Sequence, residues 1–505
     1  MSAKLQNVHV RINDDSTGQP TPVRIRFSDA AGNYYAPFGR LTDFATGVNE
    51  DVGGNLQFGK TKNAVIDGAC EIALPPGPIT IAISKGFEYR PIRQEIHLKE
   101  GQLALRFTLE RWLNLRQKGW YSGDGRAHFL SPHAALLEGA AEDLAVVNLL
   151  ALHWQPDPYQ PPALPVLLGF SGQQPALETA DHLVVVNTLN TSVLGNLALL
   201  NCHRIVHPVH FERINWTLAD WCGQCHRKGG LVAWPDHDSW PLTREEDFVS
   251  EGLLDLILGK VDALEVDLFP WNGEDRPDWY TLLSAGLHVP LLGASRKKSN
   301  ATVLGCVRTY ARLNPGEEFT YKNWIEAVRA GRTFVTNGPL LDFTINGQGP
   351  GSSLELPAET KTISVHAEAR SLVPFERLEV IHNGTVVAEK KATGAAPETI
   401  LETDLPISES GWWALRCWGD QNVQASICPQ PVSAHSSAIY IRRAGKPAIP
   451  QLDAVQAVLG HCEGFGQMLE RLHRQGQFAG EVDRQRLTGI FNEARAILQA
   501  KLREI

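Results

Sequence analysis

This sequence has no long apolar run, few sulfur-containing side chains and no excess of positive charge. The longest apolar stretch, Leu144 to Leu152, is interrupted by Asn148 and is too short to span a membrane. The first fifteen residues lack the apolar core of a signal peptide. Basic residues number 47 against 56 acidic ones, which gives a formal charge of −9. We therefore expect a cytoplasmic protein that binds neither nucleic acid nor membrane.

Eight cysteines among 505 residues are too few for a disulfide framework, which also favours a reducing compartment. Residues 222–226 (Cys-Gly-Gln-Cys-His) match both a haem-attachment pattern and a redox dithiol. The only methionines that could serve as axial haem ligands are Met1 and Met468, and the pattern lies late in a predicted helix rather than at its start. These contexts favour a packing role for the two thiols, or at most zinc binding together with Cys202 or His203.

The rest of the composition is that of an ordinary globular protein, with 43% apolar and 20% charged residues. The length suggests about three domains, and the pattern divides into four parts. Residues 1–112 and 338–445 alternate apolar and polar residues between turn signals, which predicts two β-sandwiches; residues 67–77 resemble a carboxypeptidase-regulatory-like β-sandwich. Residues 118–337 alternate strands with helices, which predicts a mostly parallel sheet or barrel.

Residues 451–505 predict two amphipathic helices joined as a hairpin. Each helix carries one apolar stripe, and such a stripe is buried either in the core or against a second subunit. The second alternative predicts a homo-oligomer formed through these helices. The two stripes consist of Val455, Val458, Leu459, Cys462, Phe465, Leu469 and Leu472 and of Leu487, Ile490, Phe491, Ala494, Ile497 and Leu498.

Polar clusters follow several successive strands of residues 118–337. The first strand carries residues 124–128 (Asp-Gly-Arg-Ala-His), and later strands end near Asp236-His237, at Glu265 and before residues 295–298 (Ser-Arg-Lys-Lys). Carboxylates and imidazoles are ligands for divalent metals. Because ligand sites in α/β folds collect at the carboxyl ends of the strands, we expect these clusters to form one site.

The order of these segments resembles the CehA/McbA-type metallohydrolases, a branch of the PHP (polymerase and histidinol phosphatase) superfamily. The most specific parts of the resemblance are residues 119–124 (Gly-Trp-Tyr-Ser-Gly-Asp) and 330–339 (Ala-Gly-Arg-Thr-Phe-Val-Thr-Asn-Gly-Pro), supported by residues 261–266 and 308–310. It implies a distorted seven-stranded β/α barrel, and therefore a multidomain fold, α/β plus all-β, with two sandwiches and a helical hairpin around it. It also implies two or three metal ions that activate water against phosphoesters, carbamates or other esters.

The family's metal-ligand pattern carries over to only part of this chain. The surviving ligands are Asp124, His128, Glu265 and Asp236 or His237, with Glu138 as a polar partner. Other positions of the pattern are occupied by residues of a different kind. These are Arg126, Asn148, Asn187, Asn196 and residues 295–297.

Two of the departures introduce positive charge. A guanidinium within about 5 Å of a divalent cation disfavours metal binding by several kcal/mol. Arg126 and residues 296–298 would instead attract an anion if they point inward. Other interpretations stay open at this point: a salt bridge from Arg126 to Asp124 or Glu265, a solvated loop at residues 296–298, and a core role for His128.

Three hypotheses about function follow. The first is a hydrolase with a reduced content of zinc, manganese or iron, in which Arg126, Glu138, Arg296 and Lys297 assist catalysis. The second is a catalytically degenerate barrel that binds an anionic small molecule through Arg126 and residues 296–298. The third is a scaffold whose sandwiches and C-terminal helices mediate assembly.

Overall fold

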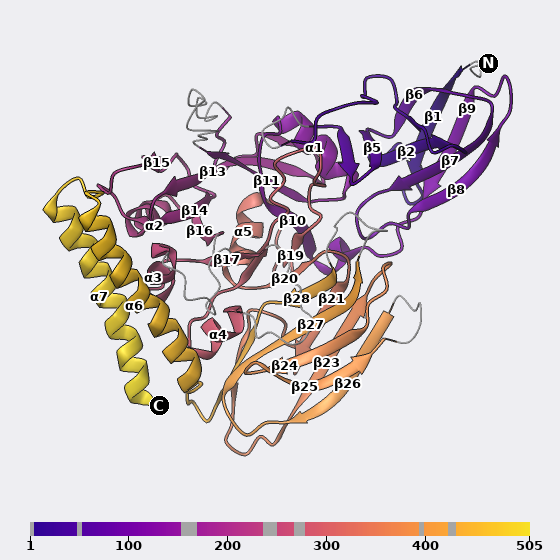
Figure 1. Cartoon of the computed structure of the whole chain (residues 1–505). Coiled ribbons are helices and arrows are strands. Elements are labelled where there is room, and N and C mark those ends of the chain that lie inside the picture. Colours follow the sequence, from indigo (N-terminus) through magenta and orange to yellow (C-terminus); the bar gives the residue numbers. More distant parts are fainter. Residues whose placement is uncertain are drawn as a thin grey trace.

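The computed structural model describes residues 5–47, 53–152, 169–235, 250–266, 278–392, 398–422 and 431–505. These residues form a mixed α/β structure with seven α-helices. The N-terminal strands and the C-terminal helix pair lie at opposite ends, with the α/β part between them and the orange C-terminal sheets along one side (Figure 1). No helix within the described ranges is long and apolar enough to cross a membrane. The predicted domain boundaries stay predictions.

The N-terminal part consists of two sheets around one hydrophobic cluster. One sheet has the order β6-β1-β9, and the other has the order β4-β5-β2-β7-β8 with β3 paired to β2. Alternation along β7 buries Ile79, Ile81 and Ile83 on one face, as a half-buried strand requires. The strands are β1 (Gln6–Asp14), β2 (Val23–Asp29), β3 (Tyr34–Tyr35), β4 (Asn55–Phe58), β5 (Thr61–Ile66), β6 (Ala69–Leu74), β7 (Gly77–Ser84), β8 (Ile92–Leu98) and β9 (Ala104–Leu109).

The central part contains a sheet in the order β10-β11-β13-β14-β16-β17-β18. β14 is antiparallel to its neighbours and the other six share one direction, so their carboxyl ends lie on one side. Its strands are β10 (Trp120–Ala127), β11 (Val146–Leu152), β13 (Leu183–Ser192), β14 (Gly195–Leu200), β16 (Leu231–Trp234), β17 (Ala263–Val266) and β18 (Leu291–Gly293), with the short β12 (Leu177–Glu178) and β15 (His210–Phe211) beside β13.

The two end strands of this central sheet come together. Ala127 at the end of β10 forms a parallel bridge with Lys297, four residues beyond β18, and the amide of His128 donates to the carbonyl of Lys297 at 2.8 Å. The sheet therefore curls back toward its first strand. The helices of this part are η1 (Leu115–Lys118), α1 (Pro132–Ala141), α2 (Leu218–Arg227), α3 (Glu251–Ile257), α4 (Asp278–Ser284) and α5 (Tyr321–Arg329). α1 is capped by Ser131, whose side chain accepts a bond from the amide of Ala134.

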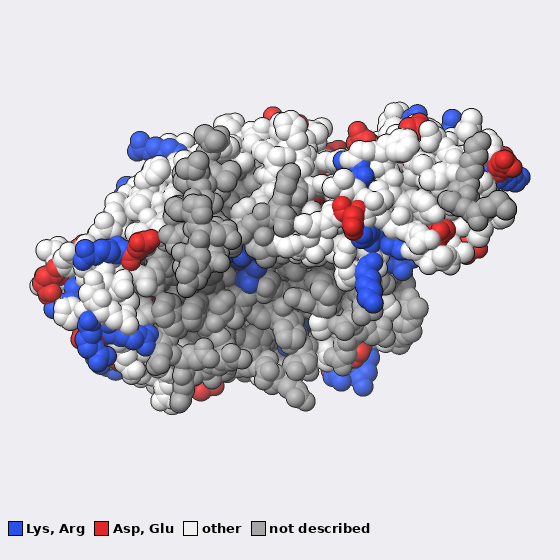
Figure 2. All heavy atoms as spheres, turned by 45° about the horizontal axis from the view of Figure 1, so that its top comes forward, with Lys and Arg blue, Asp and Glu red and all other residues white. Residues whose placement is uncertain are grey.

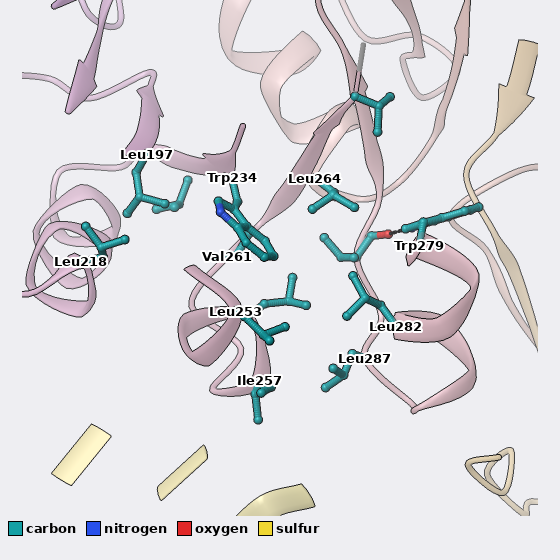
Figure 3. Packing of buried hydrophobic residues seen from close by; sticks show 14 of the residues in the cluster. Leu197, Leu218, Trp234, Leu253, Ile257, Val261, Leu264, Trp279, Leu282 and Leu287 are labelled. Atoms are coloured by element: carbon teal, nitrogen blue, oxygen red, sulfur yellow. Dashed lines mark hydrogen bonds between the residues drawn. The ribbon is translucent and has the colours of Figure 1, made fainter. Parts of the chain in front are cut away.

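Helices α3 and α4 pack against the strands that carry part of the site. Leu264 of β17 lies among Trp234, Leu253, Val261 and Leu282 in the cluster that Figure 3 shows. Successive side chains of a strand point to opposite faces. Because Leu264 faces this cluster, the neighbouring Glu265 faces the other side of the sheet.

The C-terminal sheets continue from the central one. β19 pairs with β10 and β20, and β20 pairs with β28, so the central sheet extends without interruption into the C-terminal part. A separate sheet, β21-β23-β26, faces it across a second cluster. A tight turn at Asn383-Gly384 joins β24 to β25, with positive φ at both residues. The strands are β19 (Arg308–Arg312), β20 (Thr333–Thr336), β21 (Leu340–Ile345), β22 (Ser353–Leu356), β23 (Thr362–Arg370), β24 (Arg377–His382), β25 (Thr385–Lys391), β26 (Glu398–Pro406), β27 (Gly411–Asn422), β28 (Pro431–Ser436) and β29 (Ile439–Arg443).

The C-terminal helices, α6 (Leu452–Arg474) and α7 (Glu481–Glu504), pack on the central part of the same chain (Figure 1). Every residue of the two predicted apolar stripes belongs to, or packs against, the cluster that also contains α2, α3 and α4. The amide of Ala479, between the two helices, donates to the carbonyl of Ile214 at 3.0 Å. Of the two predicted uses of the stripes, core packing is therefore confirmed. The predicted homo-oligomer stays a prediction.

Figure 2 shows acidic and basic side chains interspersed at both ends of one face. The described atoms of that face form no continuous basic stripe. The expectation that nucleic acid is not a partner stays a prediction.

Candidate functional site

The strand-end site, as we call it, consists of Asp124, Arg126, His128, Glu265 and Arg296. Strand β10 supplies the first two at alternate positions, and His128 follows it directly. Glu265 lies at the carboxyl end of β17, and Arg296 follows β18. The other two predicted ligands, at positions 236 and 237, lie outside the described residues.

Asp124 is completely buried and its carboxylate accepts four hydrogen bonds. The amides of Arg126 (3.1 Å) and Ser295 (3.0 Å) donate to Oδ1, and the amide of Gly305 (2.8 Å) and the hydroxyl of Ser295 donate to Oδ2. Burial raises the pKa of Asp124 to about 6, although these bonds oppose the rise. A carboxylate offers about four lone-pair positions. All are used here, three of them to join β10 to Ser295 and Gly305, so this side chain has none left for a metal.

Glu265 holds both arginines. Its Oε1 lies 2.6 Å from Nη2 of Arg126 and accepts a bond from Nε of Arg296 at 3.1 Å. Arg296 also donates to the carbonyl of Pro235 at 2.8 Å. The side chain of Arg126 is 7% exposed and that of Arg296 is 19% exposed, so neither extends into bulk water. The salt-bridge interpretation of Arg126 is therefore confirmed with Glu265 as its partner, and the solvated-loop interpretation of Arg296 is wrong.

His128 is held as a neutral imidazole. Its Nδ1 lies 2.9 Å from the carbonyl oxygen of Leu150, which can only accept, so Nδ1 carries the proton. Burial lowers the pKa of His128 to about 3, and the charge of Arg126 adds to this effect. Nε2 is consequently an acceptor. It is buried and has no hydrogen-bond partner.

The side chains of Lys297 and Glu138 face each other, and the expectation that they assist catalysis stays a prediction. Both are buried, with Nζ of Lys297 3.4 Å from Oε2 of Glu138. Lys297 also donates to the carbonyls of Ser299 (3.1 Å) and Thr302 (2.7 Å). Glu138 accepts from the amide of Gly54 at 2.8 Å, in the N-terminal part. Arg296 contacts Glu265 whereas Lys297 contacts Glu138, which in turn links the central part to Gly54.

Two of the departures from the family pattern form a hydrogen-bonded ring with Tyr321. The tyrosine hydroxyl donates to Oδ1 of Asn148 at 2.7 Å and accepts from Nδ2 of Asn187 at 2.9 Å. Asn187 also donates to Oδ1 of Asn148 at 3.1 Å, and Asn148 donates to the carbonyl of Asp124 at 3.0 Å. Two neutral amides that are hydrogen-bonded to each other thus lie next to Asp124. The sequence analysis missed Tyr321, which no short motif marks, and it named Ser295 only as part of residues 295–298, without a role of its own.

The described residues do not fit a bi- or trinuclear metal cluster. His128 and Glu265 each offer one unpartnered buried atom, Nε2 and Oε2. Asp124 is fully bonded, and two guanidinium groups lie against Glu265. Within the described ranges, one group of three ligand side chains has its atoms within 4.8 Å of one another, and it lies elsewhere, in the C-terminal sheet at Asp342, His366 and Glu368.

The predicted neighbourhood of the cysteines is also present. Sγ of Cys202 lies 3.4 Å from Sγ of Cys225, and both are buried. His203 bonds the carbonyl of Lys228 instead of joining them. Both thiols belong to the buried hydrophobic cluster of the central part, as the packing role requires, and the described residues around them form no three-ligand group.

No family model and no curated protein matches this sequence. A solved structure from Bacteroides vulgatus, a two-domain protein containing a predicted PHP-like metal-dependent phosphoesterase, is similar over 63% of this chain and 95% of its own, with 9% sequence identity and a TM-score of 0.33. A likeness at this TM-score supports no argument about fold or activity. The resemblance to CehA/McbA-type metallohydrolases therefore stays a prediction.

Proposed function

We propose that the strand-end site binds an anionic small molecule on protein cations, and that the barrel is catalytically degenerate relative to the metallohydrolases that it resembles. The observation that carries this proposal is the convergence of Arg126 and Arg296 on one oxygen of Glu265. One carboxylate oxygen thus contacts two guanidinium groups. The carboxylate of Asp124 is already surrounded by hydrogen-bond donors and lends little further compensation.

The two guanidinium groups themselves favour an anion over a cation at the site. Two unit charges about 4 Å apart interact by about 4 kcal/mol at an effective dielectric constant of 20. A divalent cation next to two guanidinium groups would meet repulsion of this order from each. An oxyanion would be attracted by the same groups, and guanidinium is suited to carboxylate and phosphate.

The test compares anion-induced shifts of the melting temperature in the native protein and two arginine variants. Phosphate, sulfate and citrate should each raise the melting temperature of the native chain, because binding to the folded state alone stabilises it. Arg126→Met should remove most of the shift. Arg484→Met is the matched control, since Arg484 pairs with Glu481 on the distant helix α7. Equal shifts in all three proteins would show that the anions act on the general surface and would contradict the proposal.

A hydrolase with a single metal ion is the second candidate. It is favoured by the two buried acceptors, Nε2 of His128 and Oε2 of Glu265, which have no hydrogen-bond partner. A bound zinc, manganese or iron ion would supply an activated water for ester hydrolysis. Such an ion would have to compete with Arg126 and Arg296 for Glu265, which is why we place this candidate second.

A further inference from the structure

We infer that the anion bound at the strand-end site also carries hydroxyl or amine groups, as a sugar phosphate or a hydroxy acid does. This inference rests on the proposed function and concerns the class of ligand. Three buried polar atoms of the site have no hydrogen-bond partner: Nε of Arg126, Oε2 of Glu265 and Nε2 of His128. Buried polar atoms in folded proteins are nearly always bonded, so a set of three in one place calls for an explanation.

The donor or acceptor character of each atom follows from its chemistry and contacts. Nε of Arg126 can only donate, and Oε2 of an ionised Glu265 can only accept. Nε2 of His128 accepts as well, because Nδ1 already donates to the carbonyl of Leu150. The site therefore presents one unused donor and two unused acceptors.

A simple oxyanion complements only part of this set. Sulfate offers acceptors alone, so it satisfies Nε of Arg126 but brings oxygen atoms toward the acceptors of Glu265 and His128. A ligand with O–H or N–H groups beside its anionic group satisfies all three atoms. Sites built to hydrogen-bond a ligand hydroxyl discriminate strongly against the analogue that lacks it, because the protein atoms are then left unpaired.

The three residues are joined by contact and by the chain. Nη2 of Arg126 lies 2.6 Å from Oε1 of Glu265, and His128 is two residues beyond Arg126, directly after the end of the same strand. All three residues are at most 6% exposed, so the hydrogen bonds would form away from bulk water. Bonds to charged groups in such surroundings are stronger than neutral ones.

The experiment uses pairs of anions that differ by hydroxyl groups alone. Isothermal titration calorimetry of the full chain would compare glycerol 3-phosphate with propyl phosphate, and citrate with tricarballylate, each with and without EDTA. We expect the hydroxylated member of each pair to bind at least about ten-fold more tightly. EDTA should leave the ratio unchanged.

Two histidine variants make the test specific. His128→Leu removes one acceptor, so it should reduce the preference for glycerol 3-phosphate several-fold and leave the affinity for propyl phosphate nearly unchanged. His182→Leu is the matched control: Nδ1 of His182 also bonds a backbone carbonyl, that of Leu144, but His182 precedes β13 and lies at the opposite end of the sheet. It should leave the preference as it is in the native chain.

The outcomes separate this inference from the proposed function. Equal affinities within each pair would overturn the inference while the anion site stands, and would mean that internal water satisfies the two acceptors. A preference that disappears with EDTA would also overturn it, in favour of a bound metal. Absence of binding by all four anions would remove the proposed function and the inference together.

Discussion

Nη2 of Arg126 lies 2.6 Å from Oε1 of Glu265, and Nε of Arg296 lies 3.1 Å from the same oxygen. The other oxygen, Oε2, is buried without a hydrogen-bond partner. Both guanidinium groups thus contact the same oxygen of Glu265, and the second oxygen accepts no hydrogen bond. A buried ion pair contributes little net stability, but removing one of its members leaves an uncompensated charge.

The Arg126–Glu265 pair predicts strong coupling between the two side chains. Arg126→Met and Glu265→Gln should each lower the free energy of unfolding by about 3–5 kcal/mol, because each leaves buried charge behind. The double variant should cost clearly less than the sum of the two. Urea denaturation of the four proteins measures this. Additive effects would mean that the two side chains do not compensate each other.

From the Lys297–Glu138 pair we predict that removing either charge lowers the stability of the protein without weakening its anion binding. Lys297→Met should lower the free energy of unfolding by about 3–5 kcal/mol, and adding Glu138→Gln should restore part of it. The variants that remain folded should bind phosphate and citrate as the native chain does, since this pair turns away from Glu265. If Lys297→Met is as stable as the native chain but no longer binds the anions, Lys297 is part of the binding site and this prediction is wrong.

The burial of His128 predicts that the stability of the protein decreases at acidic pH. Its pKa is about 3 in the folded protein, below the ordinary value near 6.5, because the charged form is disfavoured by burial. The unfolded chain therefore takes up the proton first, so this contribution to stability is full above about pH 6.5 and decreases as the pH falls toward 3.

Between about pH 7.5 and 5.5, the native chain should lose about 1 kcal/mol of unfolding free energy through His128 alone. His128→Asn should remove this part of the pH dependence. Burial lowers the pKa of His182 to about 4, so His182→Asn should have a similar effect and serves as a comparison. Denaturation curves at the two pH values measure the difference. An unchanged slope in His128→Asn would contradict neutral burial of this imidazole.

Metal content distinguishes the two candidate functions. The protein purified without chelators and supplied with zinc, manganese or iron should retain well below one equivalent at the strand-end site. A metal ion bound at Asp342, His366 and Glu368 would also be counted in this measurement, so the metal content of His366→Ala is measured in parallel. A full equivalent that persists in His366→Ala and disappears in His128→Ala would favour the hydrolase. Hydrolysis of generic phosphoesters by the metal-loaded chain should then accompany it.

Local patterns were sufficient for most elements of secondary structure. Ser131 followed by Pro132 is a pattern typical of a helix start and begins α1, and Asn383-Gly384 is a pattern typical of a hairpin turn and joins β24 to β25. The reason is that caps and tight turns depend on a few neighbouring residues. The stripes of α6 and α7 were also correctly identified, but amphipathic spacing does not say which surface covers them. Packing on α3 and α4 decided that.

The candidate site divides in the same way. The residues after the strands were identified because parallel strands end on one side of a sheet. Contacts between segments 84 or more residues apart decided what each side chain does. The amide of Gly305 donates to Asp124, and the amide of Gly54 donates to Glu138. Nothing near these residues in the sequence indicates that their oxygens are already bonded.

The sequence by itself determined which residues follow the strands, that arginine stands where a ligand was expected, and which helix faces are apolar, because these depend on composition and short-range periodicity. Only the tertiary structure decided that Arg296 turns toward Glu265 while Lys297 turns away to Glu138. Neighbouring residues of the same charge can point in opposite directions because each side chain turns toward the carboxylate that neutralises its charge. Another strand or helix places that carboxylate, so the local sequence does not reveal where it lies.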